Sequence, residues 1–112
     1  MIEKIILDYL TDKLTEPVYM EEPEAKPATF VLIEKTGGGK TNHISSATIA
    51  VQSYAPSMYE AAALNERVKA AMENAITLDE IVKVTLNSDY NYTNTASKRY
   101  RYQAVFDVIF YD

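Results

Sequence analysis

Apolar side chains recur every three or four positions over the first fourteen residues, which places them along one side of a helix. A second helix is predicted to begin at Ser57, because Ser57 and Glu60 have the spacing of a capping box. In that box the Ser57 hydroxyl accepts from the Glu60 amide, and the Glu60 carboxylate accepts from the Ser57 amide. This helix is expected to run to about Asn74 and to bury Ala61, Leu64, Val68, Ala71 and Met72.

Strands are predicted where branched and aromatic residues cluster or alternate with polar ones. A short edge strand is expected at 18–20, between prolines, and longer strands at 30–35, 43–54, 81–88 and 99–111. The last two are expected to pair antiparallel. The fold class is therefore α+β, with a mostly antiparallel sheet flanked by two helices in the order α-β-β-β-α-β-β. The chain has 112 residues, a length that fits a single domain spanning residues 1–112.

Two connections and one strand face suggest contact with other molecules. All three glycines fall in the segment 36–42, which predicts a turn with positive φ between two strands. The polar connection 89–98 is longer than a usual hairpin loop, so we expect it to have a function. On the last strand, Val105, Ile109 and Tyr111 form a second apolar face, which either the amino-terminal helix or another subunit must cover.

Composition narrows the classes of partner. The formal net charge is −5, so the average surface repels phosphate and anionic lipid, although an acidic wall would let a polyanion slide past. No apolar run approaches the roughly 20 residues that span a bilayer, so no membrane partner is expected. The chain has no cysteine, which excludes disulfides and thiolate chemistry and suits a reducing cytoplasm.

Two short motifs are weak indications of chemistry. Gly39-Lys40-Thr41 matches the end of a phosphate-binding loop, but Glu34 stands where that loop needs its first glycine, so a hairpin turn is the preferred interpretation. The spacing of Asn87, Asp89 and Asn91 matches the start of a calcium loop. Lys98 replaces the final glutamate of that loop, and turn-favouring side chains explain the pattern better. Hence no cofactor or metal is predicted.

His43 is the single histidine and lacks the second ligand that a zinc site needs, so a surface position is expected for it. An enzyme stays an alternative if a deep pocket were to hold His43 beside a carboxylate and a hydroxyl. The chain is otherwise predicted to be no enzyme, because it has no nucleophile-elbow sequence.

The strongest signal is a group of tyrosines and cations between residues 90 and 102. It contains Tyr90, Tyr92, Lys98, Arg99, Tyr100, Arg101 and Tyr102. Aromatic and cationic side chains together stack bases and bind phosphates, and the same types are enriched at protein interfaces. In an acidic protein we favour subunit contact, because the arginines have many carboxylate partners. A small nucleic-acid or ligand binding module using this cluster is the alternative.

The segments Tyr90-Asn91-Tyr92-Thr93 and 99–104, with the element order and the acidic balance, resemble the tail-completion or tail-terminator proteins of long-tailed bacteriophages and prophages of Gram-positive bacteria. The resemblance implies a structural minor tail protein without catalytic residues. It implies a ring of identical subunits, commonly a hexamer, that caps the tail tube, joins it to the head connector or stopper, and lets DNA pass without specific binding. Its expected location is the host cytoplasm during assembly and then the virion tail or neck, where a head-completion role is hard to distinguish.

Physical reasoning assigns contact roles in the expected ring to particular residues. Partner or lumen contact is expected at the two connections, through Gly37, Gly38, Gly39, Lys40, Tyr90, Tyr92 and Lys98. The subunit interface of the ring is expected on the exposed side of the last strand, through Arg99 and Arg101.

Overall fold

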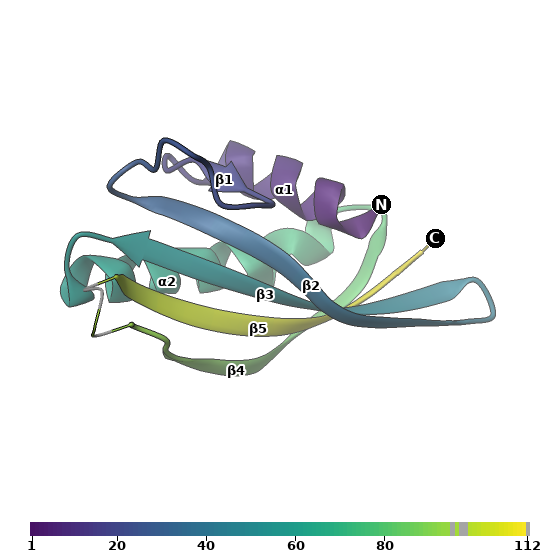
Figure 1. Ribbon diagram of the computed structural model, residues 1–112. Helices are drawn as coiled ribbons and strands as arrows, with labels where there is room; N and C mark the ends of the chain where they lie inside the picture. Colours follow the sequence, from purple (N-terminus) through teal and green to yellow (C-terminus); the bar gives the residue numbers. More distant parts are fainter. Residues whose placement is uncertain (95, 97–98, 112) are drawn as a thin grey trace.

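The computed structural model describes residues 1–94, 96 and 99–111 of the chain and confirms the predicted α+β fold and order of elements. Figure 1 shows two helices and a twisted sheet of five strands. The elements are α1 (Ile2–Lys13), β1 (Val18–Tyr19), β2 (Phe30–Thr41), β3 (Ile44–Ala55), α2 (Met58–Glu73), the 3-10 helix η1 (Asn74–Thr77), β4 (Ile81–Asn91) and β5 (Tyr100–Tyr111).

The strands lie in the order β1-β2-β3-β5-β4. The short strand β1 pairs parallel with β2, and the other three pairings are antiparallel, as predicted for β4 and β5. The register places Tyr54 opposite Arg101 and Gln52 opposite Gln103. Residues directly opposite each other project to the same side of a sheet, so this register brings together side chains that are far apart in the sequence.

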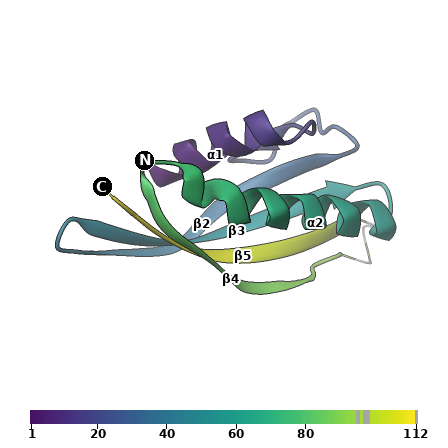
Figure 2. The same cartoon turned by 180° about the vertical axis from the view of Figure 1, so that it is seen from behind.

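Both helices pack on the same face of the sheet, which Figure 2 presents from behind. The apolar stripe of α1 and that of α2 share one core with alternate residues of β2, β3 and β5. Its fully buried members include Ile6, Leu10, Ile33, Ile49, Leu64, Val68 and Phe106. Tyr9 links the two helices, since its hydroxyl donates to the carbonyl oxygen of Ala71 at 2.7 Å. Burial raises the pKa of Tyr9, so this phenol remains a donor.

The predicted start of α2 is confirmed, with one correction. The Ser57 hydroxyl accepts from the Glu60 amide at 3.2 Å. The Glu60 carboxylate accepts from the Ser57 hydroxyl at 2.9 Å and not from the Ser57 amide. The predicted apolar face is largely correct, although Ala71 is only half-buried and the polar Asn65 is fully buried.

The predicted glycine turn is wrong. Gly37, Gly38 and Gly39 lie inside β2, which extends to Thr41, and none of them has a positive φ. The turn consists of Asn42 and His43, with φ of 51° and 66°. A two-residue turn with both φ values positive matches the right-handed twist of a hairpin, and asparagine and histidine tolerate this conformation better than most residues. The strand expected from His43 therefore begins at Ile44.

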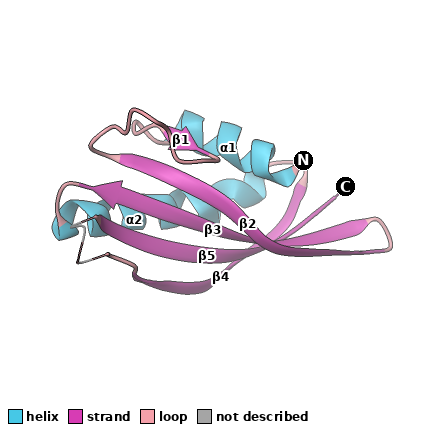
Figure 3. Ribbon diagram, viewed as in Figure 1, coloured by secondary structure: helices cyan, strands magenta, loops and turns pink. Residues whose placement is uncertain are grey.

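Neither α1 nor α2 covers the second face of the sheet, which we call the open face. On β3 and β5 the side chains that project to this face include Thr48, Ala50, Gln52, Gln103, Val105, Asp107 and Ile109. Because α1 packs on the other face, the amino-terminal helix does not cover Val105, Ile109 and Tyr111. Of the two covers expected for this apolar face, another subunit remains, and it stays a prediction. Figure 3 shows the hairpin of β2 and β3 extending beyond the ends of both helices.

Candidate interaction surface

The residues predicted to make contacts fall into two groups that the structure holds apart. Tyr90, Tyr92, Arg99 and Arg101 gather near one end of the open face, while the glycines and Lys40 lie toward the hairpin turn. Lys98 lies outside the described residues. The expected loop 89–98 was too long, because β4 continues to Asn91 and a further bridge joins Asn94 to Arg99.

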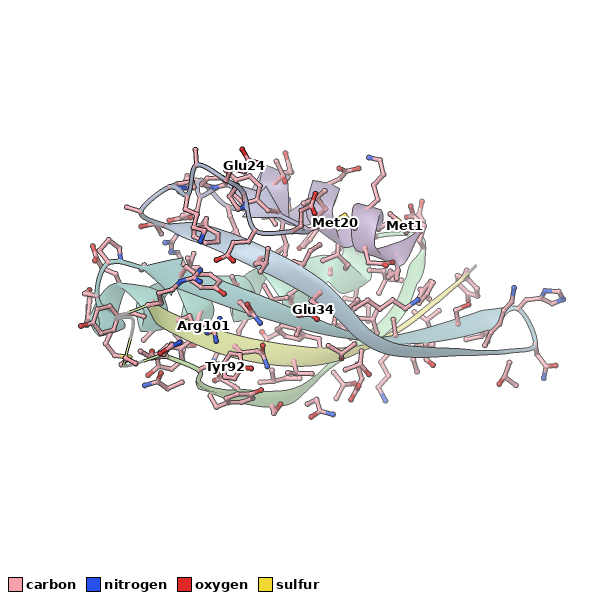
Figure 4. The ribbon with its side chains drawn as sticks, viewed as in Figure 1. Met1, Met20, Glu24, Glu34, Tyr92 and Arg101 are labelled. Atoms are coloured by element: carbon pink, nitrogen blue, oxygen red, sulfur yellow. The ribbon has the colours of Figure 1, made fainter. Side chains whose placement is uncertain are left out.

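Arg101 occupies the centre of the aromatic group. Its guanidinium carbon lies 4.3 Å from the centre of the Tyr92 ring and 5.6 Å from that of Tyr54. Its Nε donates to the carbonyl oxygen of Tyr92 at 2.7 Å, and its Nη1 donates to the Tyr54 hydroxyl at 2.8 Å. Figure 4 shows Arg101 and Tyr92 together on the open face. The cation is thus fixed by contacts within the chain.

Sequence reasoning missed the side chains that extend this group across the sheet. Phe30 stacks on Tyr54, with ring centres 4.5 Å apart and planes 7° apart. Gln52 donates to Gln103 at 2.8 Å, and Gln103 in turn donates to the Tyr90 hydroxyl. The aligned register of β3 and β5 is the signal that would have identified them, and strand prediction alone does not provide it.

Arg99 is also engaged within the chain. It forms an ion pair with Glu22, and its guanidinium carbon lies 5.0 Å from the centre of the Tyr54 ring. The contact holds the acidic segment after β1 against the end of the open face. The neighbours of Glu22 in the sequence do not indicate this contact. The ring-interface roles of Arg99 and Arg101 stay predictions.

The rest of the open face carries few uncompensated charges. Asp107 accepts from Thr48 at 3.2 Å and from Asn87 at 3.0 Å. Glu34 on β2 and Lys83 on β4, at opposite edges of the sheet, have no ion-pair partner among the described residues. Depletion of charge with enrichment of tyrosine and arginine is typical of the central part of protein interfaces.

On the helix side, β4 is tied to α2 by a polar cluster. Asp89 accepts from Lys69 and from Asn65, both at 2.6 Å, and Lys69 also pairs with Glu66 at 3.0 Å. These two carboxylates raise the pKa of Lys69, with Asp89 the larger cause. Asn87, Asp89 and Asn91 therefore lie on an extended strand, and neither a calcium loop nor the turn that we expected forms there.

A cleft of about 740 Å³ adjoins the glycine segment on the helix side of the hairpin. Lys35, Gly38 and Lys40 of β2 line it together with the first turn of α1. Its remaining walls come from the ends of β3, β4 and β5, through Ser45, Glu80 and Phe110. The cleft exists because the helices end before the hairpin does.

The other motifs have plain structural roles. Gly39-Lys40-Thr41 is extended strand rather than a phosphate-binding loop. His43 is exposed in the turn, as predicted. Within the described part of the chain, histidine and acidic side chains form no group of three that could hold a metal ion. Neither helix in that part has the length and apolar character needed to cross a bilayer.

Comparison with known proteins adds no family to this description. A scan against protein-family models finds no match, and a search of curated proteins finds no matching relative.

Proposed function

We propose that this chain is a structural subunit of a phage tail, which joins copies of itself into a ring that caps the tail tube and connects it to the head. The observation that carries this proposal is the state of the two sheet edges. Among the described residues, neither β4 nor the part of β2 beyond Leu32 has a strand partner on its outer side. Such edges readily pair with another chain.

The directions of the edge strands favour a closed, head-to-tail assembly. Three successive antiparallel pairings separate β2 from β4, so these two strands run in opposite directions. When rotation about one axis relates neighbouring copies, β4 of one copy meets β2 of the next in antiparallel orientation. A heterologous contact of this kind repeats until the rotation closes a ring.

The open face supports the role proposed for the lumen of this ring. With the helices outside, the open face lines the channel, and its arginines are engaged by Glu22, Tyr54 and Tyr92. Because both arginines are engaged and Lys83 adds a single cation at the edge of this face, the wall gives a polyanion little to bind, so DNA would pass without being held. The same engagement counts against a nucleic-acid binding module, and the proposed ring acts through contact without bond chemistry.

Sedimentation velocity of the chain, alone and with the tail-tube protein of its own phage, tests the proposal. A discrete ring-sized species that joins the tube protein is expected, and negative-stain images of it should show a central channel. A monomer in both samples at all protein and salt concentrations would overturn the proposal. Salt-sensitive binding of a single-stranded oligonucleotide by that monomer would instead support the binding-module alternative.

A further inference from the structure

The helix layer is too narrow for the sheet, and it leaves the middle of β4 partly uncovered. A helix is about 10 Å wide and strands are about 4.8 Å apart, so two helices cover roughly four strands. The remaining groove of about 460 Å³, between α2 and β4, has Val84, Leu86 and Phe106 on its floor. Leu86 lies opposite Phe106, on the helix side, and its side chain is 46% exposed.

The glycine segment is a complementary feature at the other edge of the sheet. No glycine in it has a positive φ, so backbone conformation does not require glycine there. At Gly38, however, an added Cβ would lie 3.0 Å from Lys35 Cε and 3.1 Å from the carbonyl oxygen of Ser46. Gly38 faces the helix side, because it pairs with the buried Ala47, and it borders the cleft beside α1.

Resting on the ring proposed above, we infer that β4 of one copy pairs with β2 of the next in the register that places Leu86 opposite Gly38. The Leu86 side chain then enters the cleft beside α1 of the neighbouring copy. A second copy is the occupant that fits, because Leu86 and Gly38 are both on this chain and both face the helix side of the sheet. The two strands that carry them also run in opposite directions, as an antiparallel pairing requires.

Charge agrees with this register. When Leu86 lies opposite Gly38 in an antiparallel pairing, each step back along β2 matches a step forward along β4. Lys35 is then opposite Asp89, and Thr41 is opposite Lys83. Lys35 and Asp89 both project to the helix side, since their partners within the sheet are the core residues Ile49 and Ala104. Asp89 thus gains a second cation beside Lys69. The bulge after Lys35 also meets the bulge after Leu86, so the alternation of faces stays matched on either side.

Paired cysteines test the register, because the natural chain has none. The double variant Thr41→Cys, Lys83→Cys carries both thiols on exposed positions of the open side. Under mild oxidation it should form disulfide-linked ladders of dimers, trimers and larger species. The matched control Thr41→Cys, Thr85→Cys moves one thiol two residues along the same face and should give far fewer links. Equal linking in both variants, or none in either while light scattering shows rings, would overturn the register and leave the ring intact.

A second variant tests the anchor itself. Leu86→Asp should leave the monomer folded, because Leu86 is 46% exposed, but it should abolish ring assembly, because the apolar side chain that enters the cleft is replaced by a carboxylate that must lose its water there. Tyr59→Asp on α2 is the control, since Tyr59 is 83% exposed and distant in sequence from both edge strands. Rings that persist with Leu86→Asp would overturn the inference. Absence of rings in the unsubstituted chain, both alone and with the tail-tube protein, would overturn the proposed function as well.

Discussion

Arg101 and Tyr54 face each other across β3 and β5, and the Arg101 Nη1 donates to the Tyr54 hydroxyl at 2.8 Å. Phe30 stacks on the Tyr54 ring, and the guanidinium groups of Arg99 and Arg101 also lie close to that ring. A planar cation of this kind contributes both stacking and directed hydrogen bonds, which an ammonium group cannot reproduce.

Replacing Arg101 should therefore destabilise the fold. We expect Arg101→Ala and Arg101→Lys each to lower the free energy of unfolding by about 1–2 kcal/mol, because the bonds to Tyr54 and to the Tyr92 carbonyl are lost. Urea unfolding followed by tyrosine fluorescence measures the change. Lys83→Ala, an exposed cation on the same face, serves as control and should have little effect. Equal stability of all three variants would show that the Arg101 contacts contribute nothing.

The ion pair between Glu16 and Arg67 should make stability depend on pH. Arg67 binds the Glu16 carboxylate through both Nη atoms, at 2.8 and 2.5 Å, and this hydrogen bonding holds the pKa of Glu16 below its ordinary value. The stabilisation is complete above the unfolded pKa of about 4.3 and is lost as pH falls through the lower folded value.

Comparing Glu16→Gln with the natural chain measures this contribution. At neutral pH we expect Glu16→Gln to be less stable by about 0.5–1 kcal/mol, a small value because half of the Arg67 side chain is exposed. Thermal unfolding of the two proteins should converge in acid, below pH 4. A difference that is constant across the whole pH range would exclude the carboxylate as its cause.

The hairpin turn offers a stabilising substitution. His43 has a φ of 66°, which costs a residue with a side chain more than it costs glycine. His43→Gly creates the favoured Asn-Gly turn, and we expect the free energy of unfolding to rise by about 0.5–1 kcal/mol. Thr41→Gly, at the last residue of β2 on extended backbone, should lower it instead. Opposite signs in these two variants, measured by thermal unfolding, would confirm that the turn lies at 42–43.

Neighbouring glycines should respond differently to alanine. The Cβ of Gly37→Ala would lie 3.8 Å from the nearest atom, in ordinary contact, and the φ of Gly37 is not positive. We therefore expect a gain of about 0.4–1 kcal/mol from the lost flexibility of the unfolded chain. Gly38→Ala should destabilise the fold, because the Ser46 carbonyl is backbone and cannot easily move. The same response from both variants in urea unfolding would contradict this account.

The sequence was sufficient for those features that depend on local periodicity or caps. The stripe of α1, the capping serine of α2 and the alternation along β5 all predicted the observed elements. It was misleading where residue type and strand pairing conflict. Three glycines indicate a turn by their intrinsic preference, but the ladder with β3 holds them extended, and the turn moves to Asn42 and His43.

The contact surface was only half predictable for the same reason. The cluster of Tyr90, Tyr92 and Arg101 is visible as neighbours along the chain, so sequence reasoning found it. Phe30, Tyr54 and Glu22 join it through pairings between residues 24, 47 and 77 positions apart, which only the three-dimensional arrangement reveals. Likewise, nothing local to Leu86 shows that the helix layer ends before reaching it.

The bulges on β2 and β4 bear on how many copies complete a circle. Each inserts an extra residue at an outermost strand and so increases bending and twist there. If copies join through these strands, the angle between successive subunits is fixed by irregularities of the main chain and only secondarily by the side chains that touch. Deleting or adding one residue at either position would then change the circumference of the assembly while leaving each subunit recognisably the same.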